Sequence, residues 1–166
     1  MSEEILTLVP DAEVARHRAD AAFETIAAHL RAVLPVTCEI HHVGATSVPG
    51  CLGKGDLDIN VRAPRADYAG AEATLAALYP RNDDNASLED MASFEDGTCD
   101  PPLGVQLTIA GGKWDVFTAF RDALCADDVL VGEYNAIKRR FDGKDMEAYR
   151  AAKADFADYV LARAGR

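Results

Sequence analysis

The chain has 166 residues, of which 49% are hydrophobic, and a formal net charge of −11 at pH 7. This length predicts one domain, residues 1–166, with a core of its own. The acidic charge argues against a nucleic-acid partner, because binding a phosphate backbone needs a basic surface. No apolar run approaches a membrane span, and the Met-Ser-Glu-Glu start lacks the basic region of a secretory signal, so we expect a cytoplasmic protein without membrane association.

The four cysteines, Cys38, Cys51, Cys99 and Cys125, have no Cys-x-x-Cys spacing, so neither a zinc site nor a disulfide framework is expected. Residues 81–100 form a strongly acidic stretch. Its carboxylates are Asp83, Asp84, Glu89, Asp90, Glu95, Asp96 and Asp100. Because blocks of like charge usually face water, we interpret this stretch as a solvated loop in preference to a metal site.

The first predicted element is a helix that opens at Pro10 and Asp11 and stops before Pro35. Its apolar face, at helical spacing, is Ala19, Ala22, Phe23, Ile26, Leu30 and Val33. His17 and His29 lie off this face and are expected to be exposed. A strand over residues 36–43 should follow and lead into a glycine-rich loop.

Residues 56–61 alternate strictly between polar and apolar side chains. In a strand, residues two apart share a face, so Leu57, Ile59 and Val61 should face the core. The opposite face then carries Asp56, Asp58 and Asn60. Two adjacent carboxylates repel each other unless a cation lies between them. Beside a loop rich in backbone N–H groups, they suit Mg²⁺ (or Mn²⁺) carrying phosphate.

Pro64 should break the chain, with Asp67 capping a short helix. The core face of that helix is predicted to be Tyr68, Ala71, Leu75 and Leu78. Residues 81–102 should be irregular with one short strand. Residues 103–110 alternate again and predict a half-buried strand that ends at Gly111-Gly112 and points Gln106 and Thr108 away from the core.

Residues 113–120 have two interpretations. As the second strand of a hairpin, they would place Asp115 between Trp114 and Val116 on that strand. As a helix, they would align Trp114 with Phe117, Arg121 and Leu124. Two further helices are predicted over residues 127–141 and 145–164, separated at Gly143.

Three cations lie within the apolar stripes of these C-terminal helices. Lys153 falls among Met146, Tyr149, Phe156 and Val160, Lys138 lies at the margin of its stripe, and Arg121 lies between Trp114 and Phe117. Each alone can extend past the core or pair with an acidic neighbour. Together they indicate a basic-lined cleft for a small anionic ligand. For His42, a buried structural role and a ligand contact are equally weighted.

A resemblance adds to this interpretation. The segment HHVGATSVPGCLGKGDLDINV, residues 41–61, resembles the core of the GrpB-like family, which has the nucleotidyltransferase superfamily fold. Its matching positions are His42, Gly44, Thr46, Val48, Pro49, Gly50, Lys54, Asp58 and Ile59. FRDAL at 120–124 resembles a helical segment of that family and favours the helix over the hairpin. YNAIK at 134–138 and YRAAK at 149–153 resemble its paired Tyr-x-x-x-Lys segments.

The resemblance implies an α/β (α+β) fold with a small mixed β-sheet of nucleotidyltransferase type, an N-terminal helix and a C-terminal helical half. It implies a Mg²⁺-dependent nucleotidyltransferase-like enzyme in which Asp56 and Asp58 hold the metal and support catalysis. The ligand would be a nucleoside triphosphate or a related phosphate metabolite. Its predicted contacts are His42, Gly44, Thr46, Ser47, Gly50, Lys54, Arg121, Lys138, Tyr149 and Lys153.

Two departures favour an alternative, a binding module that has lost transfer chemistry. Ala45 replaces the usual serine of the loop, and the family's His-Leu-His strand falls on Gln106 and Thr108. On the hairpin interpretation, Asp115 would match the third carboxylate that nucleotidyltransferases carry. If Asp115 is not on a strand, that carboxylate is missing as well. A partner-binding domain with a vestigial cleft is a third interpretation. The sequence does not determine the acceptor, the base preference or the oligomeric state.

Overall fold

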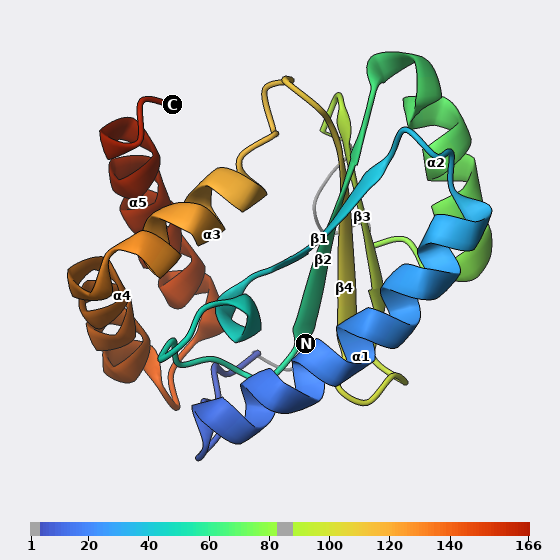
Figure 1. Ribbon diagram of the computed structural model, residues 1–166. Helices are drawn as coiled ribbons and strands as arrows, with labels where there is room; N and C mark the ends of the chain where they lie inside the picture. Colours follow the sequence, from blue (N-terminus) through green and yellow to red (C-terminus); the bar gives the residue numbers. More distant parts are fainter. Residues whose placement is uncertain (1–3, 83–87) are drawn as a thin grey trace.

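The computed structural model describes residues 4–82 and 88–166. In these residues four strands form one mixed sheet in the order β1-β2-β4-β3. The strands are β1 Glu39–Val43, β2 Leu57–Ala63, β3 Met91–Asp96 and β4 Leu103–Ile109. The central pair, β2 and β4, is parallel, and each outer strand is antiparallel to its neighbour. The predicted mixed sheet is confirmed (Figure 1).

One face of the sheet is covered by α1 Ala12–Val33 and α2 Arg65–Leu78 (Figure 1). Leu57, Ile59 and Val61 are fully buried against these helices, as the alternation predicts. The Asp11 side chain caps α1 by accepting a hydrogen bond from the Val14 N–H at 3.0 Å. The opposite face therefore receives Asp58 and Asn60.

Several boundaries differ from the sequence prediction. Val36 is exposed, and β1 begins only at Glu39. Val33 and Leu78 lie in the last turns of α1 and α2 and are exposed, so neither belongs to the core face. Pro64 occupies the cap position of α2, and Asp67 lies in its first turn, where its carboxylate accepts a hydrogen bond from the Thr37 hydroxyl at 2.5 Å.

The strand β4 is more buried than predicted. Gly104 and Thr108 are buried although they lie on the face away from α1 and α2. The reason is its central position, with β2 and β3 on either side and Asn60 donating a hydrogen bond to the Thr108 hydroxyl at 3.0 Å. The half-buried strand is therefore a wrong prediction, and only Gln106 keeps partial exposure on that face.

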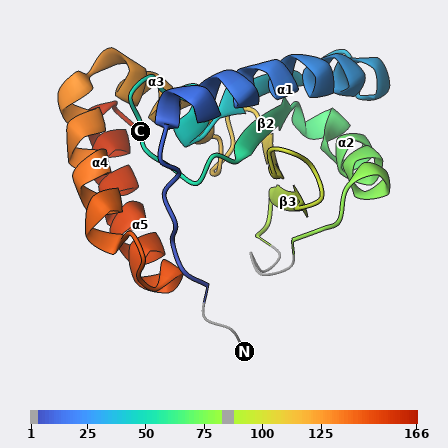
Figure 2. The same cartoon turned by 90° about the horizontal axis from the view of Figure 1, so that it is seen from below.

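The C-terminal half consists of α3 Phe117–Ala126, α4 Asp128–Phe141 and α5 Met146–Arg163. The side chains of Asp127 and Asp145 cap α4 and α5, which confirms both predicted helices. Figure 2 shows α4 and α5 side by side at the end of the molecule away from α2. The N-terminal segment runs beside them, where Leu6 exchanges backbone hydrogen bonds with Gly143 and Lys144.

The ambiguous segment before α3 is resolved in favour of the helix, but only from Phe117 onward. Residues 113–116 form turns, so the hairpin interpretation is wrong and Trp114 does not share a helix face with Phe117. In the acidic stretch, β3 is the predicted short strand, whereas Asp83 and Asp84 lie outside the described residues. Within the described ranges, none of the helices has the length and apolar character to cross a membrane.

Candidate active site

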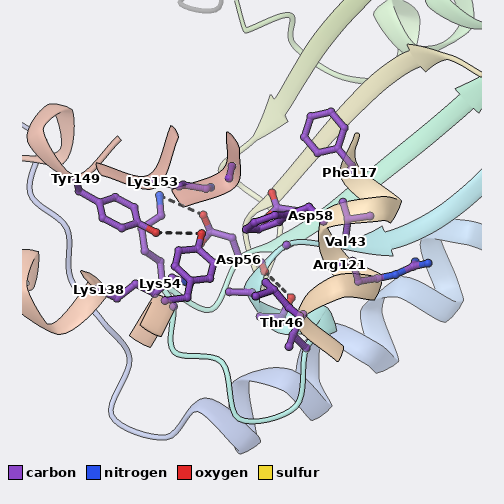
Figure 3. Close-up of a pocket in the computed structure, with 18 of the residues that line it drawn as sticks. Val43, Thr46, Lys54, Asp56, Asp58, Phe117, Arg121, Lys138, Tyr149 and Lys153 are labelled. Atoms are coloured by element: carbon purple, nitrogen blue, oxygen red, sulfur yellow. Dashed lines mark hydrogen bonds and ion pairs between the residues drawn. The ribbon is translucent and has the colours of Figure 1, made fainter. Parts of the chain in front are cut away.

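A cavity of about 290 Å³ lies between the open face of the sheet and the C-terminal helices (Figure 3). We call it the basic cavity, because its charged lining residues are Lys54, Arg121, Lys138 and Lys153 with only Asp56 and Asp58 opposing them. Apolar side chains from several elements complete the wall, among them Leu6, Val43, Phe117, Phe120 and Leu124. The shape and lining suit a ligand with an anionic end and an apolar or aromatic body.

Asp58 is held in place by glycine. A Cβ atom on Gly44 would lie 2.3 Å from the Asp58 Oδ2 atom, and one on Gly104 would lie 2.9 Å from Oδ1. Gly44 also has a φ of 77°, a conformation that other residues rarely adopt. These two positions therefore need glycine so that the carboxyl can pack against both backbones.

Burial raises the pKa of Asp58 to about 6, and the charge of Asp56 acts in the same direction. Lys153, Lys54 and Lys138 oppose the rise. Among the described residues the Asp58 carboxyl has no hydrogen-bond donor, whereas Asp56 lies 3.4 Å from the Lys54 Nζ atom. The site thus contains one paired and one unpaired carboxylate side by side.

Lys138 is almost completely buried, at 2% exposed. Its ammonium group donates to the Leu52 carbonyl oxygen, lies 3.6 Å from the Cys51 Sγ atom and sits 4.1 Å from the centre of the Tyr134 ring. Burial lowers the pKa of Lys138 to about 8. The lysine is therefore fixed at the cavity wall by a carbonyl oxygen, a thiol and an aromatic ring.

Lys153 and Tyr149 reach the same wall from α5. Lys153 is exposed, not partly buried as its stripe predicts, and its charge lowers the pKa of Asp58. The Tyr149 hydroxyl donates to that of Tyr134 at 3.4 Å. In Figure 3, Lys54, Lys138, Lys153 and Tyr149 lie on one side of the two aspartates.

Arg121 lies on the other side, and Figure 3 shows its guanidinium directed away from Asp56 and Asp58. The guanidinium donates to the His42 carbonyl oxygen at 3.1 Å and pairs with Asp122 at 2.9 Å. All three predicted cleft cations therefore line the cavity, but only Lys138 and Lys153 lie on the side of the aspartates where Lys54 joins them from the loop.

Several backbone N–H groups of the loop between β1 and β2 are already hydrogen-bonded within the protein. The N–H groups of Ser47 and Cys51 donate to loop carbonyl oxygens, and that of Gly50 donates to Glu13 at 3.3 Å. The Thr46 hydroxyl donates to the Asp56 carbonyl oxygen at 2.9 Å. Ser47 and Gly50 are therefore engaged in the fold and lie outside the cavity lining, whereas Gly44 and Thr46 of the same loop line the cavity.

His42 is also outside the cavity. Its register partner is Ile59, so its ring faces α1, where it stacks on Phe23 with ring centres 5.3 Å apart. One ring nitrogen lies 3.1 Å from the Asp20 carboxylate and the other 2.9 Å from the Thr46 hydroxyl. Burial lowers the pKa of His42. The histidine thus supports Thr46 and does not face the aspartates.

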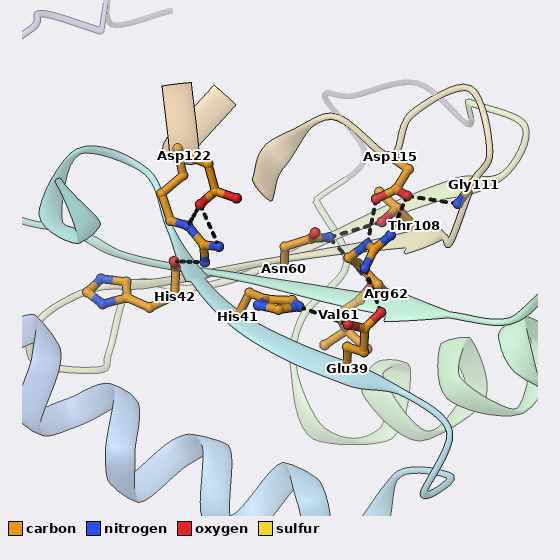
Figure 4. Close-up of polar contacts among 11 residues, drawn as sticks. Glu39, His41, His42, Asn60, Val61, Arg62, Thr108, Gly111, Asp115 and Asp122 are labelled. Carbon is orange, nitrogen blue, oxygen red and sulfur yellow. Dashed lines mark hydrogen bonds and ion pairs between the residues drawn. The ribbon is translucent and has the colours of Figure 1, made fainter. Parts of the chain in front are cut away.

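Asp115 is not a third carboxylate of the site. It is 1% exposed and accepts two hydrogen bonds from the Arg62 guanidinium, each at 2.7 Å, and one from the Gly111 N–H at 2.8 Å (Figure 4). The hydrogen bonds from Arg62 lower its pKa. Over the described residues no group of three His, Cys, Asp or Glu side chains could hold a metal ion.

Comparison with known proteins places this geometry in a family. Residues 13–163 match the sequence profile of the GrpB protein family. The chain belongs to the GrpB family. A UPF0157 protein of Vibrio cholerae is 30% identical over 136 residues, which cover 81% of this chain and 71% of that protein.

Solved structures agree on the fold. The crystal structure of the conserved protein GrpB from Enterococcus faecalis superposes with a TM-score of 0.72 at 17% identity, covering 98% of this chain and 100% of that one. Cid1 poly(U) polymerase, solved with Mg and 3′-dATP bound, gives a TM-score of 0.53 at 11% identity over 80% of this chain and 42% of Cid1. The GrpB chain therefore has a nucleotidyltransferase-like fold, as predicted.

The sequence missed several residues of the basic cavity. Gln106 was noticed only as a departure from the family, yet it lines the cavity on β4, two residues beyond the Gly104 that pairs with Asp58. A polar residue in the middle of an apolar strand was the available signal. The sequence contains no such signal for Leu6 and Phe117, because their place in the cavity wall depends on how distant segments pack.

Proposed function

We propose that this GrpB protein is a Mg²⁺-dependent nucleotidyltransferase-like protein that binds a nucleoside triphosphate or a related phosphate metabolite in the basic cavity. One observation carries the proposal: the adjacent carboxylates of Asp56 and Asp58 face Lys138 and Lys153 across a single recess. The fold of Cid1, which was solved with magnesium and a nucleotide, is consistent with it.

The two carboxylates fit a hard divalent cation, which prefers oxygen ligands. Asp58 is unpaired, and burial together with Asp56 disfavours its ionised form, a cost that a bound cation would offset. Asp56 and Asp58 would hold the ion, which when bound would neutralise phosphate charge. Lys138 and Lys153 would bind the phosphates, because the loop N–H groups of Ser47 and Gly50 are already engaged.

The apolar part of the wall would receive the rest of the ligand. Phe117 and Phe120 at the start of α3 and Val43 of β1 line this part of the cavity. Aromatic surface of this kind is suited to a base or another flat group, which can stack on a ring without hydrogen bonds. This division of the wall favours a nucleotide over free phosphate.

A second candidate, binding without transfer, is favoured by Asp115. Its carboxylate is bound to Arg62 and does not reach the cavity. The β4 residue that lines the cavity with Asp56 and Asp58 is Gln106, an amide that cannot replace the charge of a third carboxylate. A protein that only binds would show a metal-dependent rise in melting temperature with nucleotide and would release no pyrophosphate with any acceptor.

Thermal shift with each nucleoside triphosphate, with and without Mg²⁺ or Mn²⁺, tests the proposal, because a ligand that binds only the folded state raises the melting temperature. We expect a metal-dependent rise that Asp58→Asn abolishes. The control is Asp158→Asn, which changes the same charge on the exposed face of α5. No response to any triphosphate, or an equal response in both variants, contradicts the site.

A further inference from the structure

A second cavity, of about 560 Å³, adjoins the basic cavity. The two share a wall made of Lys54, Asp56, Asp58 and Gln106, which we call the shared wall. The rest of the second lining comes from β3, β4, the segments that flank them, the start of α5 and the N-terminal segment. These residues are Glu4, Asn82, Glu95, Gly97, Pro102, Leu103, Gly104, Glu147 and Arg150. The two aspartates thus stand between two recesses.

The second cavity has the opposite electrostatic character to the first. Its side chains include five carboxylates, Glu4, Asp56, Asp58, Glu95 and Glu147, against the two cations Lys54 and Arg150. Both cations are already paired, Arg150 with Glu4 at 2.8 Å and Lys54 with Asp56 at 3.4 Å. Within the described ranges Glu95 and Glu147 have no ion-pair partner, so we call this recess the acidic cavity.

This arrangement limits what the acidic cavity can accept. An oligonucleotide end would bring phosphates against Glu95 and Glu147, and like charges repel. A group carrying an ammonium would instead gain charge-assisted hydrogen bonds with those carboxylates. Pro102 and Leu103 are the apolar side chains in a mostly polar lining, so a hydroxyl-bearing molecule fits better than an apolar one.

We propose that the acidic cavity binds the acceptor of the transfer reaction, and that this acceptor is a small amine-bearing alcohol, such as an amino sugar. The inference rests on the proposed function. The acceptor's ammonium would lie between Glu95 and Glu147, and its hydroxyl would reach the shared wall. There the hydroxyl oxygen bonds to the α-phosphorus of the triphosphate, the bond from that phosphorus to pyrophosphate breaks, and the hydroxyl proton leaves to water.

Binding of glucosamine, measured by ligand-detected NMR at constant ionic strength, tests the assignment, with glucose as the neutral counterpart. The double variant Glu95→Gln/Glu147→Gln removes the unpaired carboxylates. Its control, Glu24→Gln/Glu133→Gln, makes the same change of net charge at exposed positions on α1 and α4. We expect glucosamine to bind in preference to glucose, with about tenfold or greater weakening in the first variant and none in the control.

Equal binding of glucose and glucosamine overturns the acceptor assignment, because it means that the ammonium is not recognised. Equal weakening in both double variants also overturns it, because it means that only the overall negative charge is sensed. The same proteins are then given Mg²⁺ and the triphosphates in thermal shift. A retained nucleotide response with no specific glucosamine binding refutes the acceptor assignment alone. Specific glucosamine binding without any nucleotide response refutes the proposed function, and the acceptor role with it.

Discussion

The basic cavity and the acidic cavity lie on either side of the same two aspartates and differ in charge. The first has four cations, Lys54, Arg121, Lys138 and Lys153, against two carboxylates, and the second has two cations against five carboxylates. The chain as a whole carries −11. Net charge therefore describes the surface that a partner first meets, whereas a binding site is defined by the few charges that the fold places around it.

The two cavities also differ in how their charges are held. Lys138 is buried and fixed by a carbonyl oxygen and an aromatic ring, so its position does not depend on a ligand. Glu95 and Glu147 are exposed at the rim of the acidic cavity. A preorganised cation loses little freedom when it binds phosphate, so we expect the basic cavity to bind its ligand more tightly.

The largest effect tests whether Asp115 belongs to either cavity. Asp115→Asn should lower the free energy of unfolding by about 3 kcal/mol at pH 7, because it leaves Arg62 without its buried partner. The pKa of Asp115 is lowered, so the wild-type contribution is present above its ordinary value of 3.8 and is lost as the pH falls through the lower folded-state pKa.

Urea denaturation at pH 7 and pH 3 measures this difference between Asp115→Asn and the wild type. At temperatures where the variant is folded, its affinity for nucleotide should equal that of the wild type. Rapid Mg²⁺-dependent pyrophosphate release that disappears in this variant would return Asp115 to the site and contradict its structural role.

The second effect has the opposite sign. Asp58→Asn should raise the free energy of unfolding by up to about 3 kcal/mol at pH 8, because the wild-type folded state must ionise a carboxyl whose pKa is about 6 in place of 3.8. Ionisation of Asp58 lowers the wild-type stability only at pH values above 3.8, the pKa of the carboxyl in the unfolded chain. The full loss is reached above pH 6, where the folded protein is ionised as well. The gain should therefore shrink as the pH falls toward 4, which urea denaturation at pH 4.5 and pH 8 measures. A gain that does not depend on pH would contradict the buried carboxyl.

The third effect concerns Lys153, which the structure places at the cavity but exposed. Lys153→Met should weaken nucleotide binding by about 1–3 kcal/mol, the scale of a hydrogen bond to a charged group. Its stability should change by less than about 1 kcal/mol, because an exposed charge contributes little. Calorimetric titration beside Lys144→Met, an exposed lysine outside the cavity, provides the comparison. Equal affinities in the two variants would remove Lys153 from the site.

The smallest effect is expected at Arg121, whose guanidinium is directed away from the aspartates. Arg121→Gln should change nucleotide affinity by less than about 1 kcal/mol, since only a peripheral charge is removed. The same titration measures it. A loss as large as that of Lys153→Met would show that the arginine turns into the cavity when ligand binds.

Patterns within one element were sufficient for much of the fold. The alternation of residues 56–61 placed Leu57 and Ile59 in the core and Asp58 on the opposite face. The last two helices were predicted from Asp127 and Asp145, and the structure shows these two residues as their caps. These features depend on neighbours a few residues away, so a single sequence contains them.

Features that depend on how two elements meet could not be predicted in this way. His42 lies on the face of the sheet away from Asp58 because β1 pairs Val43 with Asp58, a register set by the whole strand pair. Gln106 enters the site because β4 runs parallel to β2. The direction of Arg121 follows from a hydrogen bond to a distant backbone carbonyl oxygen.

The central claim is that Asp56 and Asp58 hold a metal ion whose nucleotide lies toward Lys138 and Lys153. Anomalous diffraction from crystals grown with Mn²⁺ and a non-hydrolysable nucleoside triphosphate tests it directly. We expect a manganese peak at the two carboxylates, the phosphates next to Lys138 and Lys153, and the base against Phe117 and Phe120. A nucleotide bound elsewhere, or manganese absent from both aspartates while the nucleotide is present, would contradict it.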